Sequence, residues 1–243
     1  MDLKSLIFFV VALGVNGDEI QSPTVTPAEL VQAADNVRFP KDSFSVMVNV
    51  INYENNQKST ERVYQILSKG NTDTIVKTLS PASDAGQIML MKDSDLWIFL
   101  KDVDQPVRMP ASQRLTGQVA NGDLARANFT GDYTPLFIRN ESQYAVLELT
   151  AVNRKVTYHK VLYWIDIYTS RPHKAEFYTV SGKLLKTCFY LNFKPMNNSI
   201  RPTRLIMKDE LNKDQYSEML YSDMKSVELP DKVFTKEYLK KLK

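Results

Sequence analysis

Residues 86–135 read GQIMLMKDSDLWIFLKDVDQPVRMPASQRLTGQVANGDLARANFTGDYTP, and the rest of the chain is arranged around them. The first half predicts a β-hairpin, because the apolar runs 88–91 and 96–100 flank the polar tetrad 92–95. The second half has no long apolar run and is rich in Gly, Asn and Asp. A connection this long inside a domain is usually functional or disordered. The regular spacing of Leu115, Val119 and Leu124 favours a lid, which we place at residues 114–133 and call the lid segment.

Alternating apolar residues predict strands on both sides of this stretch, with turn residues between neighbours. Short turns and few helices favour an antiparallel meander of about eleven strands. Because several strands are apolar on both sides, we expect one strongly curved sheet wrapped round a helix. The predicted strands cover residues 44–50, 62–69, 74–79, 88–91, 96–100, 144–151, 156–168, 173–180, 183–193, 203–210 and 215–227, with an edge segment at 106–109.

Helices are predicted near the two ends of the chain. Thr26 suits an N-cap, Pro27 the first helical position and Asn36 the end of the first helix. Residues 234–242 have the spacing of an amphipathic helix. The predicted fold class is therefore mainly β with a minor helical part, and residues 26–243 are expected to form one domain after a linker at 18–25.

Residues 1–17 have the features of a signal peptide. Lys4 supplies positive charge, residues 6–15 form an apolar core, and small residues precede Asp18. Ten apolar residues are fewer than the roughly 20 that span a bilayer. Because Asp2 is atypical of such a leader, an uncleaved short anchor is the alternative. No cysteine follows the leader, so we expect an exported, soluble chain without a lipid anchor.

Composition gives no support for nucleic-acid binding, because the formal net charge is only +3. The single cysteine, Cys188, excludes an internal disulfide, and its alternating surroundings predict a buried structural thiol. His159 and His173 are the only histidines, and a metal site would require further ligands. No nucleophile elbow or phosphate-binding loop occurs. We therefore predict no enzymatic activity, no cofactor and no metal.

Methionine and aromatic side chains recur on both faces of the predicted strands. They fit an ordinary core, and they also fit a cavity for acyl chains, because Met adapts to irregular shapes. Each buried methylene gains about 0.8 kcal/mol, so such a cavity holds a long chain without specific polar contacts. Strand parity, which a one-residue register error would reverse, gives the expected lining: Val46, Val48, Val50, Leu90, Leu96, Ile98, Leu100, Leu147, Leu149, Tyr163 and Ile165.

Two stretches carry a family resemblance. Residues 95–97 (DLW), 108–115 and 121–133 (NGD…ANFTGDY) resemble the outer-membrane lipoprotein-sorting protein family, the LolA/LolB-like group. So do residues 171–187, which read RPHKAEFYTVSGKLLKT. The similarity extends over most of residues 28–230.

The resemblance implies a half-open antiparallel barrel whose apolar concave face is covered by helices. It also implies a periplasmic carrier of lipoprotein acyl chains or other lipids, with an inner-membrane transporter and an outer-membrane acceptor as partners. The family's mobile arginine is not assigned, because Arg62, Arg108 and Arg126 are all candidates. The expected lid or gating residues are Arg108, Arg114, Asp123, Arg126, Asp132 and Tyr133.

Two other functions are compatible with this sequence. A lipid-sensing or adaptor subunit on the same fold, working with a resistance-nodulation-type transporter, would bind lipid without moving it. A hydrolase of envelope glycans or lipids would need converging carboxylates with perturbed pKa values in the cavity.

Overall fold

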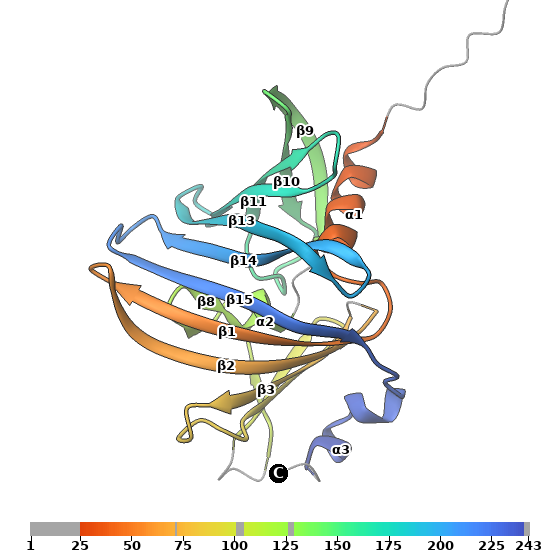
Figure 1. Ribbon diagram of the computed structural model, residues 1–243, viewed down its shortest axis with the longest axis vertical. Coiled ribbons are helices and arrows are strands. Elements are labelled where there is room, and N and C mark those ends of the chain that lie inside the picture. Colours follow the sequence, from red (N-terminus) through yellow and green to blue (C-terminus); the bar gives the residue numbers. More distant parts are fainter. Residues whose placement is uncertain (1–24, 71, 101–104, 126–128, 241–243) are drawn as a thin grey trace, which may run out of the picture.

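A computed structural model describes residues 25–70, 72–100, 105–125 and 129–240, so the predicted leader and most of the linker lie outside the described residues. Thirteen strands form one open antiparallel sheet, and two short strands form a separate pair (Figure 1). The strands are β1 (Phe44–Glu54), β2 (Gln57–Lys69), β3 (Asp73–Ser80), β4 (Ile88–Lys92), β5 (Asp95–Phe99), β6 (Val107–Met109), β7 (Arg114–Thr116), β8 (Val119–Ala120), β9 (Tyr133–Glu141), β10 (Tyr144–Ala151), β11 (Lys160–Asp166), β12 (Pro172–Tyr178), β13 (Leu184–Met196), β14 (Ser199–Asp209) and β15 (Gln215–Ser226).

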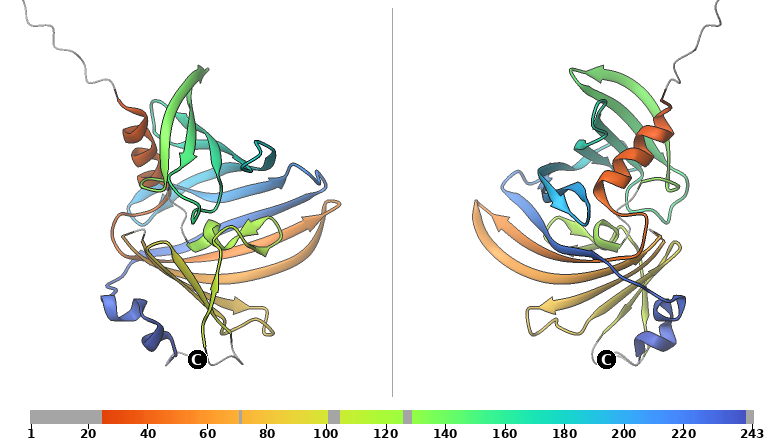
Figure 2. Two further views of the ribbon diagram at one scale, coloured as in Figure 1. Left: turned by 180° about the vertical axis from the view of Figure 1, so that it is seen from behind. Right: turned by 45° about the vertical axis from the view of Figure 1, so that its right-hand side comes forward.

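The strand order places the lid segment across the open side of the sheet. The order is β6-β5-β4-β3-β2-β1-β15-β14-β13-β12-β11-β10-β9, so β1 and β15 pair in the middle and β6 and β9 form the two edges. Because β6 and β9 are joined through residues 110–132, this connection has to pass from one edge to the other. The two views in Figure 2 show it inside the curve of the sheet.

In the described part of the chain three α-helices accompany the sheet: α1 (Pro27–Arg38), α2 (Asn121–Ala125) and α3 (Lys236–Lys240), which follows a 3-10 turn at Asp231–Phe234. Thr26 caps α1 as predicted, and Glu29 completes a capping box with it. Helix α1 contacts β9, β11, β12 and β14. Within the described residues no helix is long and apolar enough to cross a membrane.

The buried apolar residues form two clusters on opposite sides of the sheet. The inner cluster joins the concave face to Val31 and Ala34 of α1 and to Leu124 of α2. The outer cluster lies over β3, β4 and β5 and is covered by Phe234 and Leu239 from the C-terminal helices. Strands β3, β4 and β5 therefore bury one face in each cluster.

Several expectations require correction. The described residues contain fifteen strands instead of about eleven, because the edge segment at 106–109 forms β6, β7 and β8 lie inside the lid segment, and β9 follows it. Strand β9 was not predicted, since its exposed residues give no apolar alternation. Strand β11 begins at Lys160 instead of 156. Helices were expected to cover the concave face. In the structure α1 lies near one edge of the sheet, and in the lid segment only the five residues of α2 are helical.

Candidate functional site

The concave face of the sheet carries most of the predicted cavity lining. Val46, Val48, Val50, Leu96, Leu147, Leu149, Tyr163 and Ile165 are all buried in the inner cluster, and Ile98 packs against it while partly exposed. Leu100 is partly buried just beyond β5. These side chains come from strands that lie on both sides of the central β1–β15 pair, so the apolar surface is continuous across the sheet.

Leu90 is the exception, because it faces the other way. It belongs to the outer cluster with Phe99 and Phe234, while its neighbours Met89 and Met91 belong to the inner cluster. The predicted parity of β4 was therefore wrong by one residue, which moves a side chain to the opposite face of a sheet. All four residues from Ile88 to Met91 are buried, so the alternation offered no signal.

The lid segment fills the hollow of the sheet. Val119, Leu124 and Phe129 are buried in the inner cluster, and Gln118 and Asn121 are buried beside them. The cavity that remains inside has a volume of about 30 Å³, which is room for a water molecule or two. In this conformation side chains of the chain itself fill the hollow of the sheet around this cavity.

The first of three polar anchors holds residues 116–118 to the middle of the sheet. Asn52 donates from Nδ2 to Thr116 Oγ1 at 2.8 Å and accepts at Oδ1 from Ser217 Oγ at 2.6 Å. The backbone N–H of Gln118 donates to the same Ser217 hydroxyl at 2.8 Å. Gly117 has φ +50°, and a Cβ there would lie 1.9 Å from Asn52 Oδ1. Only glycine fits this close approach.

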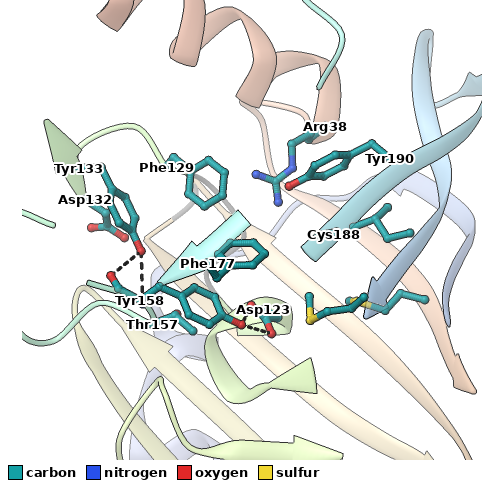
Figure 3. A pocket seen from close by; sticks show the side chains of 13 residues that line it. Arg38, Asp123, Phe129, Asp132, Tyr133, Thr157, Tyr158, Phe177, Cys188 and Tyr190 are labelled. Carbon is teal, nitrogen blue, oxygen red and sulfur yellow. Dashed lines mark hydrogen bonds between the residues drawn. The ribbon is translucent and has the colours of Figure 1, made fainter. Parts of the chain in front are cut away.

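The second anchor joins α2 to the loop before β11 (Figure 3). The Tyr158 hydroxyl donates to the Asp123 carboxylate, at 2.8 Å to Oδ2 and 2.9 Å to Oδ1. The N–H of Ala120 donates to Asp123 Oδ2 at 2.7 Å. Lys186 of β13 donates to the Tyr158 hydroxyl at 3.3 Å. Burial raises the pKa of Asp123, and nearby Lys186 lowers it only in part.

The third anchor joins the end of the lid segment to α1. Asp35 Oδ2 accepts from the N–H of Phe129 at 2.9 Å and from the N–H and Oγ1 of Thr130, both at 2.7 Å. Arg38 lies 3.6 Å from Asp35 Oδ1 and packs on the rings of Phe129 and Tyr190, 5.0 and 5.2 Å from their centroids. Burial raises the pKa of Asp35, and Arg38 opposes the shift.

The expected gating residues are distributed over this assembly. Asp123 and Tyr133 are part of it, because the Tyr133 hydroxyl also donates to the Tyr158 carbonyl at 3.0 Å. Asp132 is buried and lines the small cavity. Arg114 is exposed at the start of the segment. Arg108 pairs with Asp95 at the surface, and Arg126 lies outside the described residues.

Sequence reasoning missed the buried arginine. Arg38 is 7% exposed, and its Nη1 has no hydrogen-bond partner among the described residues. Of the proposed candidates, Arg62 is half-buried and bonds to Asp84 and Thr116, while Arg108 is exposed. A cationic side chain in the last turn of a helix is favoured by the negative end of the helix dipole. The position of Arg38 in the sequence therefore gave no sign that its side chain faces inward.

Cys188 and the two histidines take no part in the three anchors. Cys188 is buried as predicted, and burial raises its pKa to about 12. His173 stacks on Tyr144 at 4.3 Å between centroids, and His159 is exposed. Within the described ranges no three His, Cys, Asp or Glu side chains gather in a way that could hold a metal ion. Asp35 and Asp123, whose pKa values are both raised by burial, each accept hydrogen bonds from backbone N–H groups of the lid segment.

The raised pKa of Asp123 predicts a pH dependence. A carboxyl whose folded pKa exceeds its unfolded value stabilises the fold most below the unfolded pKa, near 4, and loses that contribution as pH rises through the folded pKa. We expect the unfolding free energy of Asp123→Asn, relative to the unsubstituted protein, to rise with pH above 4 and then level off. Chemical denaturation at pH 4–8 measures this difference. A difference that is flat or falls with pH contradicts the assignment.

Several solved structures are similar to this chain in fold. A LolA superfamily protein from Nitrosomonas europaea is 53% identical, with a TM-score of 0.85 over 88% of this chain and 100% of its own. A putative outer membrane lipoprotein-sorting protein domain from Vibrio parahaemolyticus is 22% identical (TM-score 0.73, 88% of this chain and 98% of its own). A DUF1329 family protein from Desulfovibrio piger is 18% identical (TM-score 0.74, 88% and 97%). The last two show a shared fold.

The fold is that of the lipoprotein-sorting proteins, and the chain belongs to the LolA superfamily. A family model described only as "Uncharacterized protein" matches residues 70–241. None of the curated proteins compared with the chain matches it. The resemblance seen in the sequence is thereby confirmed.

Proposed function

We propose that this protein is a periplasmic, non-enzymatic carrier that binds the acyl chains of lipoproteins or other lipids and delivers them toward the outer membrane. The observation that carries the proposal is that a long apolar sheet face is covered by a segment of the same chain, which polar anchors hold in place. Among the described residues, β6 and β9 each pair with a neighbouring strand on one side only, and the lid segment lies between these two edges in the chain. Membership in the LolA superfamily supports the same function.

Acyl cargo and the lid segment compete for the same apolar surface. Burial of Val119, Leu124 and Phe129 stabilises the closed form by about 5–9 kcal/mol in total, at about 1.5–3 kcal/mol for each large side chain. A fatty chain of about twelve methylenes gains about 10 kcal/mol on burial. The two contributions are similar in size. Loading and release are therefore both feasible without an external energy source acting on the carrier itself.

Arg38 is the residue that we propose as the gating arginine, in place of Arg62, Arg108 and Arg126. It contacts Phe129 of the lid segment, Tyr190 of β13 and Asp35 of its own helix. Outward movement of Phe129 would remove one face of this contact. Displacement of the lid segment would thus change the surroundings of the buried Arg38 charge.

In the complete cycle the carrier receives cargo from an inner-membrane transporter and passes it to an outer-membrane acceptor. Donor vesicles with a fluorescent acyl lipid and unlabelled acceptor vesicles test the carrier step. We expect the protein to accelerate transfer. Binding without transfer would instead indicate a lipid sensor, and the absence of binding would reject the carrier.

A substitution at Ile98 separates an effect on acyl binding from an effect on the stability of the fold. It is partly exposed on the inner face, so Ile98→Gln should fold, yet it removes one apolar contact worth about 1.5 kcal/mol or more. We expect acyl affinity to fall about ten-fold. Leu136→Gln is the matched control, because Leu136 is 61% exposed on the edge strand β9. Equal affinities for the two variants would argue against the inner face as the binding surface.

A further inference from the structure

An open groove lies outside the small internal cavity and shares a wall with it. Its two parts have volumes of about 680 and 330 Å³ and have Ser112, Arg154 and Val156 in common. We call this the outer groove. Thr157 and Tyr158 line both the larger part of the groove and the internal cavity, and Figure 3 shows their side chains beside Asp123. Tyr158 therefore forms part of the partition between groove and hollow.

The lid segment holds this partition closed. The Tyr158 hydroxyl donates to Asp123 of α2, and a Cβ at Gly122 would lie 2.0 Å from Thr157 Oγ1, so α2 packs directly on the loop. Displacement of the lid segment would remove the Tyr158 partner in α2. The outer groove would then open onto the apolar inner face.

The outer groove carries an excess of positive charge. Arg108 and Lys155 both pair with Asp95, so these three side chains sum to +1. Arg154 is exposed and lines both parts of the groove, and the part of the chain that the structure describes gives it no hydrogen bond or ion pair. The N–H groups and the charge of the Arg154 guanidinium can thus interact with a ligand. An arginine fork matches the oxygens of a phosphate.

The same groove has an apolar side. Val180, which is 81% exposed, lines its larger part together with Leu185 and Ala151. An apolar wall beside an uncompensated cation is complementary to an amphiphile with an anionic head. A free phosphate ion would use the cation and leave the apolar wall unused.

We propose that the outer groove binds the phosphate headgroup of an anionic acyl lipid at Arg154, with the acyl chains directed past Tyr158 onto the inner face. This inference rests on the carrier function and specifies its cargo class. One cation near a lipid headgroup contributes about 1 kcal/mol. That contribution corresponds to an approximately five-fold preference for an anionic over a zwitterionic lipid with the same acyl chains.

The test uses vesicles that contain phosphatidylglycerol and phosphatidylcholine with identical acyl chains. The lipid extracted by the protein is counted by native mass spectrometry. We expect about five-fold more phosphatidylglycerol, loss of this preference in Arg154→Gln, and partial retention in Arg154→Lys. Extraction of phosphatidylcholine should fall less, because the choline cation of that lipid offsets the charge of its phosphate. Lys213→Gln, an exposed lysine in the β14–β15 turn, is the control and should keep the preference.

Each outcome decides the proposal. Equal extraction of both lipids by the unsubstituted protein, or an equal effect of Arg154→Gln and Lys213→Gln, overturns the headgroup site and leaves the carrier function intact. Arg154-dependent binding of inorganic phosphate seen by calorimetry, without any preference for phosphatidylglycerol, assigns the groove to free phosphate. Extraction of neither lipid rejects the carrier together with this inference.

Discussion

Asp35→Ala is expected to lower the free energy of unfolding by about 3–5 kcal/mol, because it leaves the buried Arg38 charge without its carboxylate. It also removes the acceptor for three hydrogen bonds from Phe129 and Thr130. Asp35→Asn should cost less, since its amide oxygen can accept from the same donors. Denaturant unfolding measures both variants, and faster amide exchange at Phe129 should accompany the loss.

Asp42→Ala is the matched control for this prediction. Asp42 is an exposed aspartate that follows the same helix, and surface substitutions usually stay within about 0.5 kcal/mol. If Asp35→Ala were to cost less than 1 kcal/mol, the third anchor would not hold the lid segment. An equal loss in both aspartate variants would also count against the anchor.

Gly117→Ala is expected to destabilise the closed form by about 2–3 kcal/mol. A side chain there adopts a positive φ, which costs about 1–2 kcal/mol, and its Cβ would lie 1.9 Å from Asn52 Oδ1 and 2.5 Å from Ser217 Oγ. Because cargo competes with the closed lid segment, the apparent acyl affinity should rise, by up to about 30-fold for 2 kcal/mol. Thermal unfolding and lipid titration measure the two effects.

Gly131→Ala separates backbone strain from the clash. Gly131 has φ +84°, but a Cβ there would meet nothing within 4 Å. We expect this variant to lose only about 1 kcal/mol and to change acyl affinity much less than Gly117→Ala. Similar results for the two glycines would mean that the approach to Asn52 and Ser217 does not control closure.

The parts of the fold that were predictable from the sequence depend on regular local patterns. Val46, Val48 and Val50 lie two residues apart, and Ser45 and Asn49 mark the opposite face, so their shared face followed from strand periodicity. The run 88–91 is apolar throughout, so Leu90 was placed on the wrong side of the sheet. Strand β9 was missed because an exposed edge strand that contains Pro135 shows neither alternation nor a buried run.

The anchors of the lid segment could not be predicted, because they join residues far apart in the sequence. Asn52 and Ser217 are 165 residues apart and meet only because β1 pairs with β15. Arg38 is buried only because Phe129 and Tyr190 converge on it from other elements. Local sequence gives no information on such convergence. The expectation that residues 114–133 act as a lid could be formed from the sequence, because their length and apolar spacing are properties of one continuous stretch, and it stays a prediction.

The central claim is that acyl cargo enters only when the lid segment leaves the hollow, and a reversible cross-link tests it most directly. A Cβ at Gly122 would lie 3.1 Å from Thr157 Cβ, slightly below the 3.5–4.5 Å typical of disulfides, so Gly122→Cys with Thr157→Cys should form a bond after a small shift. Cys188 is buried and should not interfere. Thr157→Cys alone controls for oxidation.

Lipid uptake is then measured on the oxidised and the reduced double variant. The account predicts that the oxidised protein takes up almost no lipid and that a reducing agent restores uptake to the level of the Thr157→Cys control. Equal uptake by the oxidised and reduced forms would show that lipid binds without displacement of the lid segment, and would contradict the account.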